Sequence, residues 1–417
     1  MITRLFAASL LFAAPLAAQM PVPTTNARVK SAVDAVKADN AWTIDQQISI
    51  CEIPAPPFKE TVRGLEYKRR LEALGLRNVR IDTAGNVIAE RPGSGNGPTV
   101  VIAGHLDTVF PDGTDVRVKR DGTRLTAPGI GDDCRGLAVV LAVARAFQNA
   151  SVETVGTVYF VGNVGEEGPG NLRGVRNLFN HELKGKIDYF ISVDGTGLDV
   201  TSRAVGSNRY KVTYKGPGGH SYGAFGRVNP IHALGRAIAA IGDVRVPSSP
   251  KTTFNVGRIS GGTSVNSISF EASAEIDMRS ESAAELLTLD TRVQNILRNA
   301  LNAENARWRA GTGGTAMLTL QIDTIGLRPA NGTQTDKTPI VATALAAGKA
   351  LGFTPRTTAS STDANLPMSM RIPAITIDGG GRGGDAHALT EWYDDTATGW
   401  LGPQWAVLLV AALAGVK

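Results

Sequence analysis

The stretch that decides the fold is "PTVVIAGHLDTVF", residues 98–110. Its apolar half is typical of a strand that is buried on both faces of a sheet. His105 and Asp107 follow at the point where the apolar run stops. The chain has only five histidines, so one that stands at a strand end beside a carboxylate directs attention to the other strand ends.

The same pattern continues along the chain. Residues 137–150, "LAVVLAVARAFQNA", are helix-like, and residues 157–164, "TVYFVGNV", and 189–195, "YFISVDG", are strand-like. Continuous apolar strands with a helix between them indicate a mostly parallel sheet that is covered on both faces. In such sheets the functional groups gather at the carboxyl ends of the strands. We therefore predict an α/β catalytic domain.

Acidic and imidazole side chains stand at further strand ends and in the loops beyond them. They are Asp132 and Asp133 in "GDDCRG", Glu166 and Glu167 in "GEEG", Asp194 in "VDG", and His387 in a loop after the strand that ends at Asp378. Because the carboxyl ends of parallel strands lie along one edge of a sheet, these groups can converge with His105. Such ligands without thiolates suit Zn²⁺, Mn²⁺ or Co²⁺, and five of them with one bridging carboxylate would hold two ions.

From about residue 204 the sequence changes character. Residues 209–215, "RYKVTYK", alternate between apolar and polar side chains, as a half-solvated strand does. They are followed by a helix-like stretch at 230–241, two strand-like runs at 251–259 and 267–279, and a long helix-like stretch at 283–303. This order predicts a small α+β domain of ferredoxin-like type, inserted at 204–314 between two parts of the catalytic domain, 19–203 and 315–417. The run "TAMLTLQID", from residue 315, either closes the insertion or returns to the main sheet.

The two ends of the chain are both apolar. Residues 1–18 combine Arg4, an apolar core and a small-residue end, which predicts a signal peptide cleaved near Ala18 and therefore export to the periplasm or beyond. The run from Trp405 to Val416 is too short to span a bilayer, so it predicts a core helix.

Composition limits the remaining classes of function. Hydrophobic residues make up 42% and charged residues 19%, as in soluble globular proteins. The formal net charge of +5 is scattered, which argues against a nucleic-acid or membrane partner. Cys51 and Cys134 are the only cysteines. They can form one bridge in an oxidising compartment, but two buried thiols are the favoured state.

The motifs "GHLDTV", "GDDCRG", "GEEG", "VDG" and the late "AH" before "EW" together resemble a family of dinuclear zinc peptidases and deacylases. That family includes carboxypeptidase G, acetylornithine deacetylase, succinyl-diaminopimelate desuccinylase and peptidase T. The resemblance begins near residue 53 and continues to "HALTEW". It includes "GPGGHSYG" and "GGTSVNSI", which resemble the lid domain of the family. This resemblance also suggests a homodimer formed through the lid domain.

The resemblance implies a role for each residue of the metal site. The site would hold two zinc ions, or Co²⁺ or Mn²⁺ in their place. His105 and Asp194 would bind one ion, Glu167 and His387 would bind the other, and Asp132 would bridge the two. "DDCRG" lacks the lysine that family members often carry, so Asp133 stays open as the alternative bridge. Asp107 would hydrogen-bond the free ring nitrogen of His105.

The resemblance also implies catalytic and substrate-binding roles. Glu166 would be the general base for a hydroxide that bridges the two metal ions. His220 of the lid would reach the oxyanion, and Asn266 and Arg279 would bind a substrate carboxylate. Asp363, in "SSTDANLP", also lies in a family-like segment, and no role is assigned to it.

The expected function is that of an exported zinc metallopeptidase that hydrolyses small peptides, in the manner of a carboxypeptidase or a di- or tripeptidase. The alternative within the family is a deacylase that acts on an N-acyl amino acid. A minor alternative is a non-catalytic binding protein. The presence of Glu166 and of the whole ligand set argues against that reading.

Overall fold

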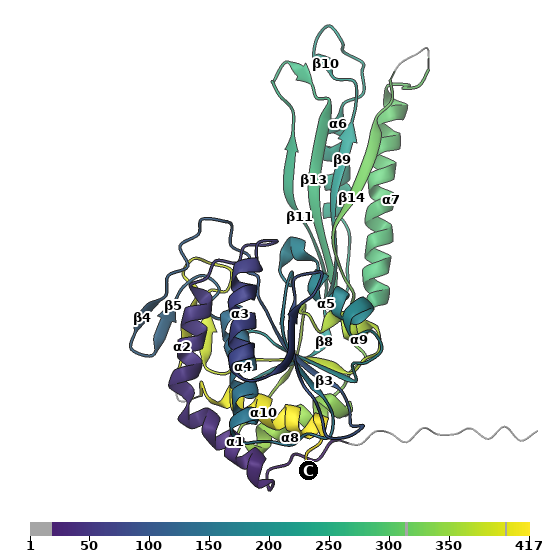
Figure 1. Ribbon diagram of the computed structural model, residues 1–417. Coiled ribbons are helices and arrows are strands. Elements are labelled where there is room, and N and C mark those ends of the chain that lie inside the picture. The colour runs from purple at the N-terminus through teal and green to yellow at the C-terminus, as the bar shows by residue number, and fades with distance from the viewer. Residues whose placement is uncertain (1–18, 313–315, 397) are drawn as a thin grey trace, which may run out of the picture.

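The computed structural model describes residues 19–312, 316–396 and 398–417. The predicted signal peptide, residues 1–18, lies outside the described residues. The chain forms a rounded main body and an elongated insertion that projects from it (Figure 1). The described residues before and after the insertion together form the main body.

The main body is built on an eight-stranded sheet. Its strands in spatial order are β1 (Arg77–Ile81), β2 (Val87–Arg91), β6 (Val158–Asn163), β3 (Val100–His105), β7 (Tyr189–Val193), β16 (Ala374–Ile377), β8 (Val200–Ala204) and β15 (Thr357–Ser360). The four central strands are parallel, because β3 pairs in parallel with β6 and β7, and β7 pairs in parallel with β16. The predicted mostly parallel sheet is confirmed.

Helices cover both faces of this sheet. Val100 and Ile102 of β3 join the hydrophobic cluster on one face, and Val101 and Ala103 join the cluster on the other, because successive residues of a strand point to opposite sides. The first face carries α1 (Ala27–Ala38), α4 (Cys134–Asn149), α8 (Pro339–Ala350) and α10 (Leu401–Ala414), and the second carries the short α5 (Arg173–Asn177) and α9 (Asn365–Ser369).

Two helices near the N-terminus complete the main body. They are α2 (Asn40–Cys51), which packs on α4, and α3 (Thr61–Ala73), which packs on β1 and β2. The predicted C-terminal core helix is confirmed as α10, whose residues 402–414 are buried. Within the three described ranges, no helix is both long and apolar enough to cross a membrane.

The insertion has a sheet and a hydrophobic core of its own. Its antiparallel strands lie in the order β11 (Thr252–Gly261), β13 (Glu271–Ser280), β9 (Gly206–Lys215) and β14 (Thr319–Arg328), and α6 (Pro230–Gly242) and α7 (Ala283–Arg307) pack against them. The expected end of the insertion, residue 314, lies before β14 and would leave this strand outside the sheet to which it belongs. Leu318 packs in the core of the insertion and β14 pairs with β9, so by strand pairing the insertion continues to Arg328.

A small antiparallel sheet on the main body was not foreseen from the sequence. It joins β17 (Arg382–Gly384) and β18 (Trp392–Asp394) to β5 (Arg124–Thr126) and β4 (Lys119–Asp121). Because β18 pairs with β5, the loop that carries His387 is tied to the segment that leads into α4. This pairing joins two parts of the chain that lie far apart in the sequence.

The prediction of two free thiols is wrong. Cys51 at the end of α2 and Cys134 at the start of α4 form a disulfide, with Cα atoms 5.4 Å apart. The two residues are separated by 83 positions, and α2 was not predicted, so nothing in the local sequence indicated that they meet.

Candidate active site

The candidate site lies at the carboxyl ends of neighbouring parallel strands. His105 ends β3, Glu166 and Glu167 follow β6, and Asp194 follows β7. His387 lies further along the chain after β16, in the loop between β17 and β18. The predicted convergence of these groups at one edge of the sheet is therefore present. Close packing at this edge explains one glycine of "GDDCRG": a Cβ on Gly136 would collide with the carbonyl oxygen of Val193.

The five residues expected to bind metal form two groups that share Asp132. The ligand atoms of His105, Asp132 and Asp194 all lie within 4.8 Å of one another, as do those of Asp132, Glu167 and His387. Asp132 Oδ1 is 2.9 Å from His105 Nε2, and its Oδ2 is 3.1 Å from His387 Nε2. Each oxygen of Asp132 thus faces one group, which is the arrangement that a bridging carboxylate requires.

Asp133, the alternative bridge, is already engaged in other bonds. Its carboxylate accepts hydrogen bonds from the backbone N–H of Gly136, at 2.9 Å, and of His105, at 2.8 Å. It therefore caps the N-terminus of α4 and fixes the end of β3. Asp133 is fully buried, and the peptide bond that joins it to Asp132 is cis. The geometry favours Asp132 over Asp133 as the bridge.

Asp107 acts differently from the sequence-based expectation. His105 Nδ1 lies 3.0 Å from the backbone carbonyl oxygen of Asp107, whereas the nearest carboxylate oxygen of Asp107 is 3.7 Å away. A carbonyl oxygen can only accept, so Nδ1 carries the proton and Nε2 faces Asp132. The Asp107 carboxylate instead accepts the backbone N–H groups of Glu166, at 3.1 Å, and Glu167, at 2.9 Å. It therefore holds the "GEEG" loop rather than the imidazole.

Glu391 holds the loop that carries Asp132. Its side chain is buried, and its carboxylate accepts backbone N–H groups of Gly129, Gly131 and Asp132 at 3.0, 2.8 and 2.9 Å. Burial and the charge of Asp132 raise the pKa of Glu391 to about 7, against the opposing effect of these hydrogen bonds. Glu391 is the first residue of the motif "EW", and the sequence pattern indicated no role for it.

The carboxylates of the site are crowded and buried, so their charges need compensation. Burial, followed by the charge of Asp132, raises the pKa of Asp194 well above its usual range. Hydrogen bonds to Asp132 and Glu167 raise the pKa of His387 to about 10. For His105, burial disfavours the charged ring, but the hydrogen bond to Asp132 and the nearby carboxylates outweigh it and raise the pKa. Two imidazoles and three carboxylates without a thiolate fit divalent cations such as Zn²⁺.

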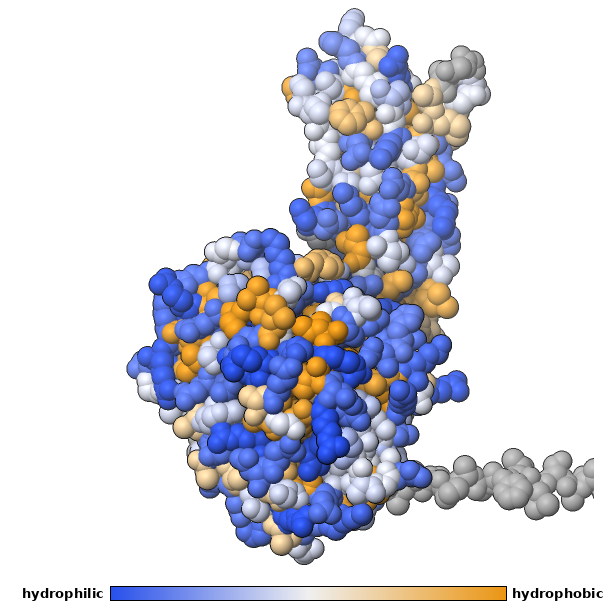
Figure 2. All heavy atoms as spheres, in the orientation of Figure 1, coloured by the Kyte–Doolittle hydropathy of each residue, from blue (hydrophilic) through white to orange (hydrophobic). Residues whose placement is uncertain are grey.

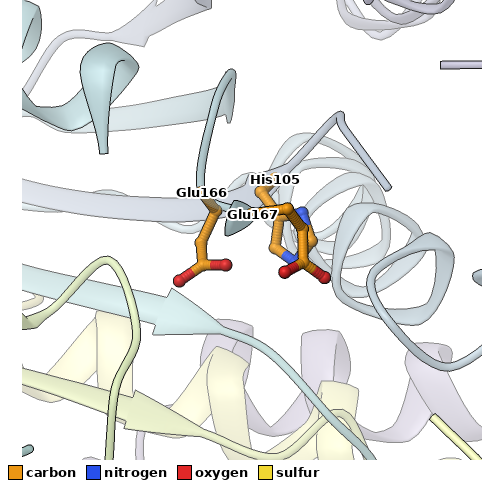
Figure 3. Close-up of side chains that lie close together, drawn as sticks. All are labelled: His105, Glu166 and Glu167. Carbon is orange, nitrogen blue, oxygen red and sulfur yellow. The ribbon is translucent and has the colours of Figure 1, made fainter. Parts of the chain in front are cut away.

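Glu166, the expected general base, lies beside this cluster. Figure 3 shows the carboxylate of Glu166 beside the carboxylate of Glu167 and the ring of His105. The ligand atoms of these three residues also lie within 4.8 Å of one another. Glu166 Oε1 accepts a hydrogen bond from Arg328 Nη1 at 2.7 Å, and both side chains are buried. Arg328 was not among the predicted site residues, because only the pairing of β14 with β9 brings it to Glu166.

A cavity of about 800 Å³ opens beside the cluster, between the main body and the insertion. Asp132, Glu166, Asp194 and His387 line its main-body side. Its insertion side includes the predicted substrate-binding residue Arg279, together with Arg209, Asp277 and Arg328.

The other two predicted lid residues lie elsewhere. His220 is exposed in the short strand β10 (Gly219–His220), and its Nδ1 accepts the backbone N–H groups of Tyr222 and Gly223. Asn266 is exposed next to β12 (Ser267–Ile268), which pairs with β10. Neither residue lines the cavity within this chain, so the structure does not bring them to the metal cluster.

The chain is similar in sequence to known proteins. The chain is 25% identical over 354 residues to YqjE of Bacillus subtilis (strain 168). The alignment covers 80% of this chain and 89% of YqjE. It is 29% identical over 250 residues to succinyl-diaminopimelate desuccinylase of Bordetella avium (strain 197N), across 55% of this chain and 65% of that enzyme.

The fold is also known from solved structures. The crystal structure of YXEP from Bacillus subtilis, described as a dinuclear metal binding peptidase, superposes with a TM-score of 0.66 at 19% identity and covers 90% of this chain and 99% of that one. At this identity the likeness concerns the fold alone. The model of peptidase family M20/M25/M40 matches residues 101–401. The matched residues make up most of this chain. The chain therefore belongs to peptidase family M20/M25/M40 and is a hydrolase of that family.

Proposed function

We propose that this protein is an exported, zinc-dependent metallopeptidase that hydrolyses an amide bond in small peptides. The observation that carries the proposal is the position of Asp132, whose two oxygens face two separate groups of ligands while Glu166 lies beside them. His105 and Asp194 would hold one ion, Glu167 and His387 the other, and Asp132 both. When bound, the two ions would supply an acidified water and polarise the carbonyl group of the scissile bond.

The chain's own residues account for the proton transfers. Glu166 would take the proton of the attacking water and pass it to the nitrogen of the leaving amine, so that the C–N bond breaks and a free carboxylate and amine form. Arg328 holds Oε1 of Glu166 at 2.7 Å and so fixes the direction of the carboxylate. Asp107 supports this by holding the backbone of Glu166 and Glu167.

The cavity is suited to a substrate with a carboxylate. Arg279 faces it from the insertion, and a guanidinium group can bind a carboxylate through two parallel hydrogen bonds. This supports a carboxypeptidase-like or di- or tripeptidase-like activity. The alternative is an N-acyl amino acid deacylase, because the released amino acid would present the same carboxylate.

We also propose a homodimer formed through the insertion, in which a second copy supplies His220 and Asn266 to the site. Figure 2 shows hydrophobic residues on the surface of the insertion. Large apolar side chains near His220 are strongly exposed: Tyr222 at 89%, Phe225 at 80% and Val265 at 103%. Such exposure is typical of surfaces that bind another protein.

Export is proposed from two observations. Residues 1–18 have the pattern of a signal peptide. The Cys51–Cys134 disulfide supports an oxidising compartment, because disulfides persist there and are rare in the cytosol.

The test begins with purified protein that is stripped of metal and reloaded with Zn²⁺, Co²⁺ or Mn²⁺. Its hydrolysis of dipeptides, tripeptides and N-acyl amino acids is then measured for the wild type and for Glu166→Gln, with the exposed Glu72→Gln as the matched control. We expect metal-dependent hydrolysis that only Glu166→Gln abolishes, and the best substrate separates peptidase from deacylase. Bound metal without hydrolysis of any substrate would favour the minor alternative, a binding protein. A protein that binds no metal would refute the ligand assignment.

A further inference from the structure

Two arginines of the insertion share one carboxylate at the wall of the cavity. Asp277 of β13 lies directly across from Arg209 of β9, and Arg279 lies two residues further along β13, on the same face as Asp277. Arg209 Nε donates to Asp277 Oδ1 at 3.0 Å, and Arg279 Nε donates to Asp277 Oδ2 at 2.8 Å. All three residues line the cavity that contains the metal cluster.

This arrangement leaves both guanidinium ends available. Each arginine uses its Nε on Asp277, and in residues 19–312, 316–396 and 398–417 no protein group accepts a hydrogen bond from the Nη atoms of Arg209 or Arg279. The side chains of Arg209 and Arg279 are 21% and 43% exposed, and both line the cavity. A pair of Nη atoms forms a planar fork that matches a carboxylate.

The charges of this wall do not cancel. Arg209 and Arg279 carry two positive charges against one negative charge on Asp277, and the third arginine of the wall, Arg328, is paired with Glu166. A substrate with one carboxylate needs only one of the two forks. The second fork is therefore in excess for such a substrate.

We propose that Arg209 is a specificity residue that binds a second carboxylate, so that preferred substrates release an acidic amino acid, aspartate or glutamate, from the amide nitrogen. Arg279 binds the main-chain carboxylate and Arg209 the side-chain carboxylate. Adjacent strands lie about 4.8 Å apart, a spacing that the two carboxylates of aspartate or glutamate can match. This inference rests on the proposed function, since it concerns the substrate of the same site.

The competing explanation is that Arg209 only holds Asp277 and thereby orients Arg279. The two explanations differ in what Arg209→Gln does to matched substrates. If Arg209 binds the second carboxylate, the variant loses discrimination between a substrate that ends in Glu and the isosteric one that ends in Gln. If Arg209 only orients Arg279, the variant loses activity toward both substrates in equal proportion.

The experiment measures kcat/KM of the metal-loaded protein for peptides or N-acyl amino acids that end in Glu or in Gln. We expect the wild type to prefer the acid by on the order of 10–100-fold, and Arg209→Gln to reduce this preference to about threefold or less. Arg209→Lys should keep part of the preference. The matched control is Arg258→Gln, which removes an exposed arginine that pairs with Glu275 across the same sheet.

Binding of the products provides a readout that needs no turnover. Calorimetry with free glutamate and free glutamine should show tighter binding of glutamate to the wild type, and the difference should disappear in Arg209→Gln. Equal binding of both amino acids by the wild type, or a parallel loss for both in Arg209→Gln, would overturn the role of Arg209. If glutamate is preferred in binding and no amide is hydrolysed, the proposed activity fails and the inference about Arg209 stands.

Discussion

Arg328 and Glu166 form a buried ion pair that joins the insertion to the catalytic edge of the main body, with Arg328 Nη1 2.7 Å from Glu166 Oε1. Arg328 is the last residue of β14, and it also donates to the backbone carbonyl of Glu166. The position of the candidate general base therefore depends on a residue at the base of the insertion. This dependence leads to the first prediction.

Replacement of Arg328 by alanine should both destabilise the protein and lower its activity. A buried ion pair that loses one partner leaves an uncompensated charge, which typically costs about 3–5 kcal/mol. Urea unfolding and kcat/KM measure the two effects. In Glu166→Gln/Arg328→Ala the stability loss should be smaller than the sum of the two single losses. Additive losses would show that the two side chains do not act as a pair.

Glu391 should control metal retention without touching the metal. Its carboxylate accepts three backbone N–H groups of the loop that carries Asp132, so Glu391→Ala leaves these donors unpaired. We expect the affinity for Zn²⁺, measured by competition with a chelating dye, to fall by roughly 10–100-fold, as is typical for residues that orient metal ligands. Glu391→Gln keeps an acceptor oxygen and should lose less. Unchanged affinity in both variants would contradict this role.

Much of this site was predictable from sequence because it follows from the geometry of a parallel sheet. His105, Glu167 and Asp194 each follow an apolar run, and parallel strands bring such positions to one edge regardless of their separation. The resemblance of the motifs then implied which residue belonged to which ion.

What sequence could not supply depends on contacts between distant segments. Arg328 reaches Glu166 because β14 pairs with β9, and an alternating run gives no sign of which sheet it joins. Asp107 binds backbone groups of another loop, a bond that no residue pattern encodes. Cys51 meets Cys134 only after α2 packs on α4.

The pH dependence of stability should carry the signature of Asp378. Burial raises the pKa of Asp378 from 3.8 to about 7, and the hydrogen bond from the backbone of Asp199 only partly opposes it. Between about pH 4 and 7 the folded state then binds more protons than the unfolded state, so the free energy of unfolding falls as the pH rises through this window and stays low above it.

Asp378→Asn removes this effect, because asparagine does not titrate and its side-chain oxygen still accepts from Asp199. At pH 8 the metal-free variant should be more stable than the wild type by roughly 1–3 kcal/mol, as measured by urea unfolding from pH 5 to 8. The exposed Asp243→Asn serves as the control and should follow the wild type. A wild-type slope retained in Asp378→Asn would assign the pH dependence to another group.

The Cys51–Cys134 disulfide should stabilise both the fold and the metal centre. A crosslink between residues 83 positions apart restricts the unfolded chain by about 4–5 kcal/mol in the chain-entropy model. Cys134 also directly follows Asp133 and begins α4, so the bond anchors the segment that carries Asp132. Cys51→Ala/Cys134→Ala should therefore melt at a lower temperature and release Zn²⁺ to a chelator faster than the oxidised wild type.

The two effects can be separated because Cys51 lies on α2 and Cys134 at the metal-binding segment. Cys51→Ala removes the crosslink and leaves the side chain of Cys134 in place, so it should reproduce the double variant in both melting temperature and metal release. If melting temperature falls while metal release stays at the wild-type rate, the disulfide stabilises the fold alone. If only variants at Cys134 release metal faster, packing at the start of α4, rather than the crosslink, holds Asp132 in position.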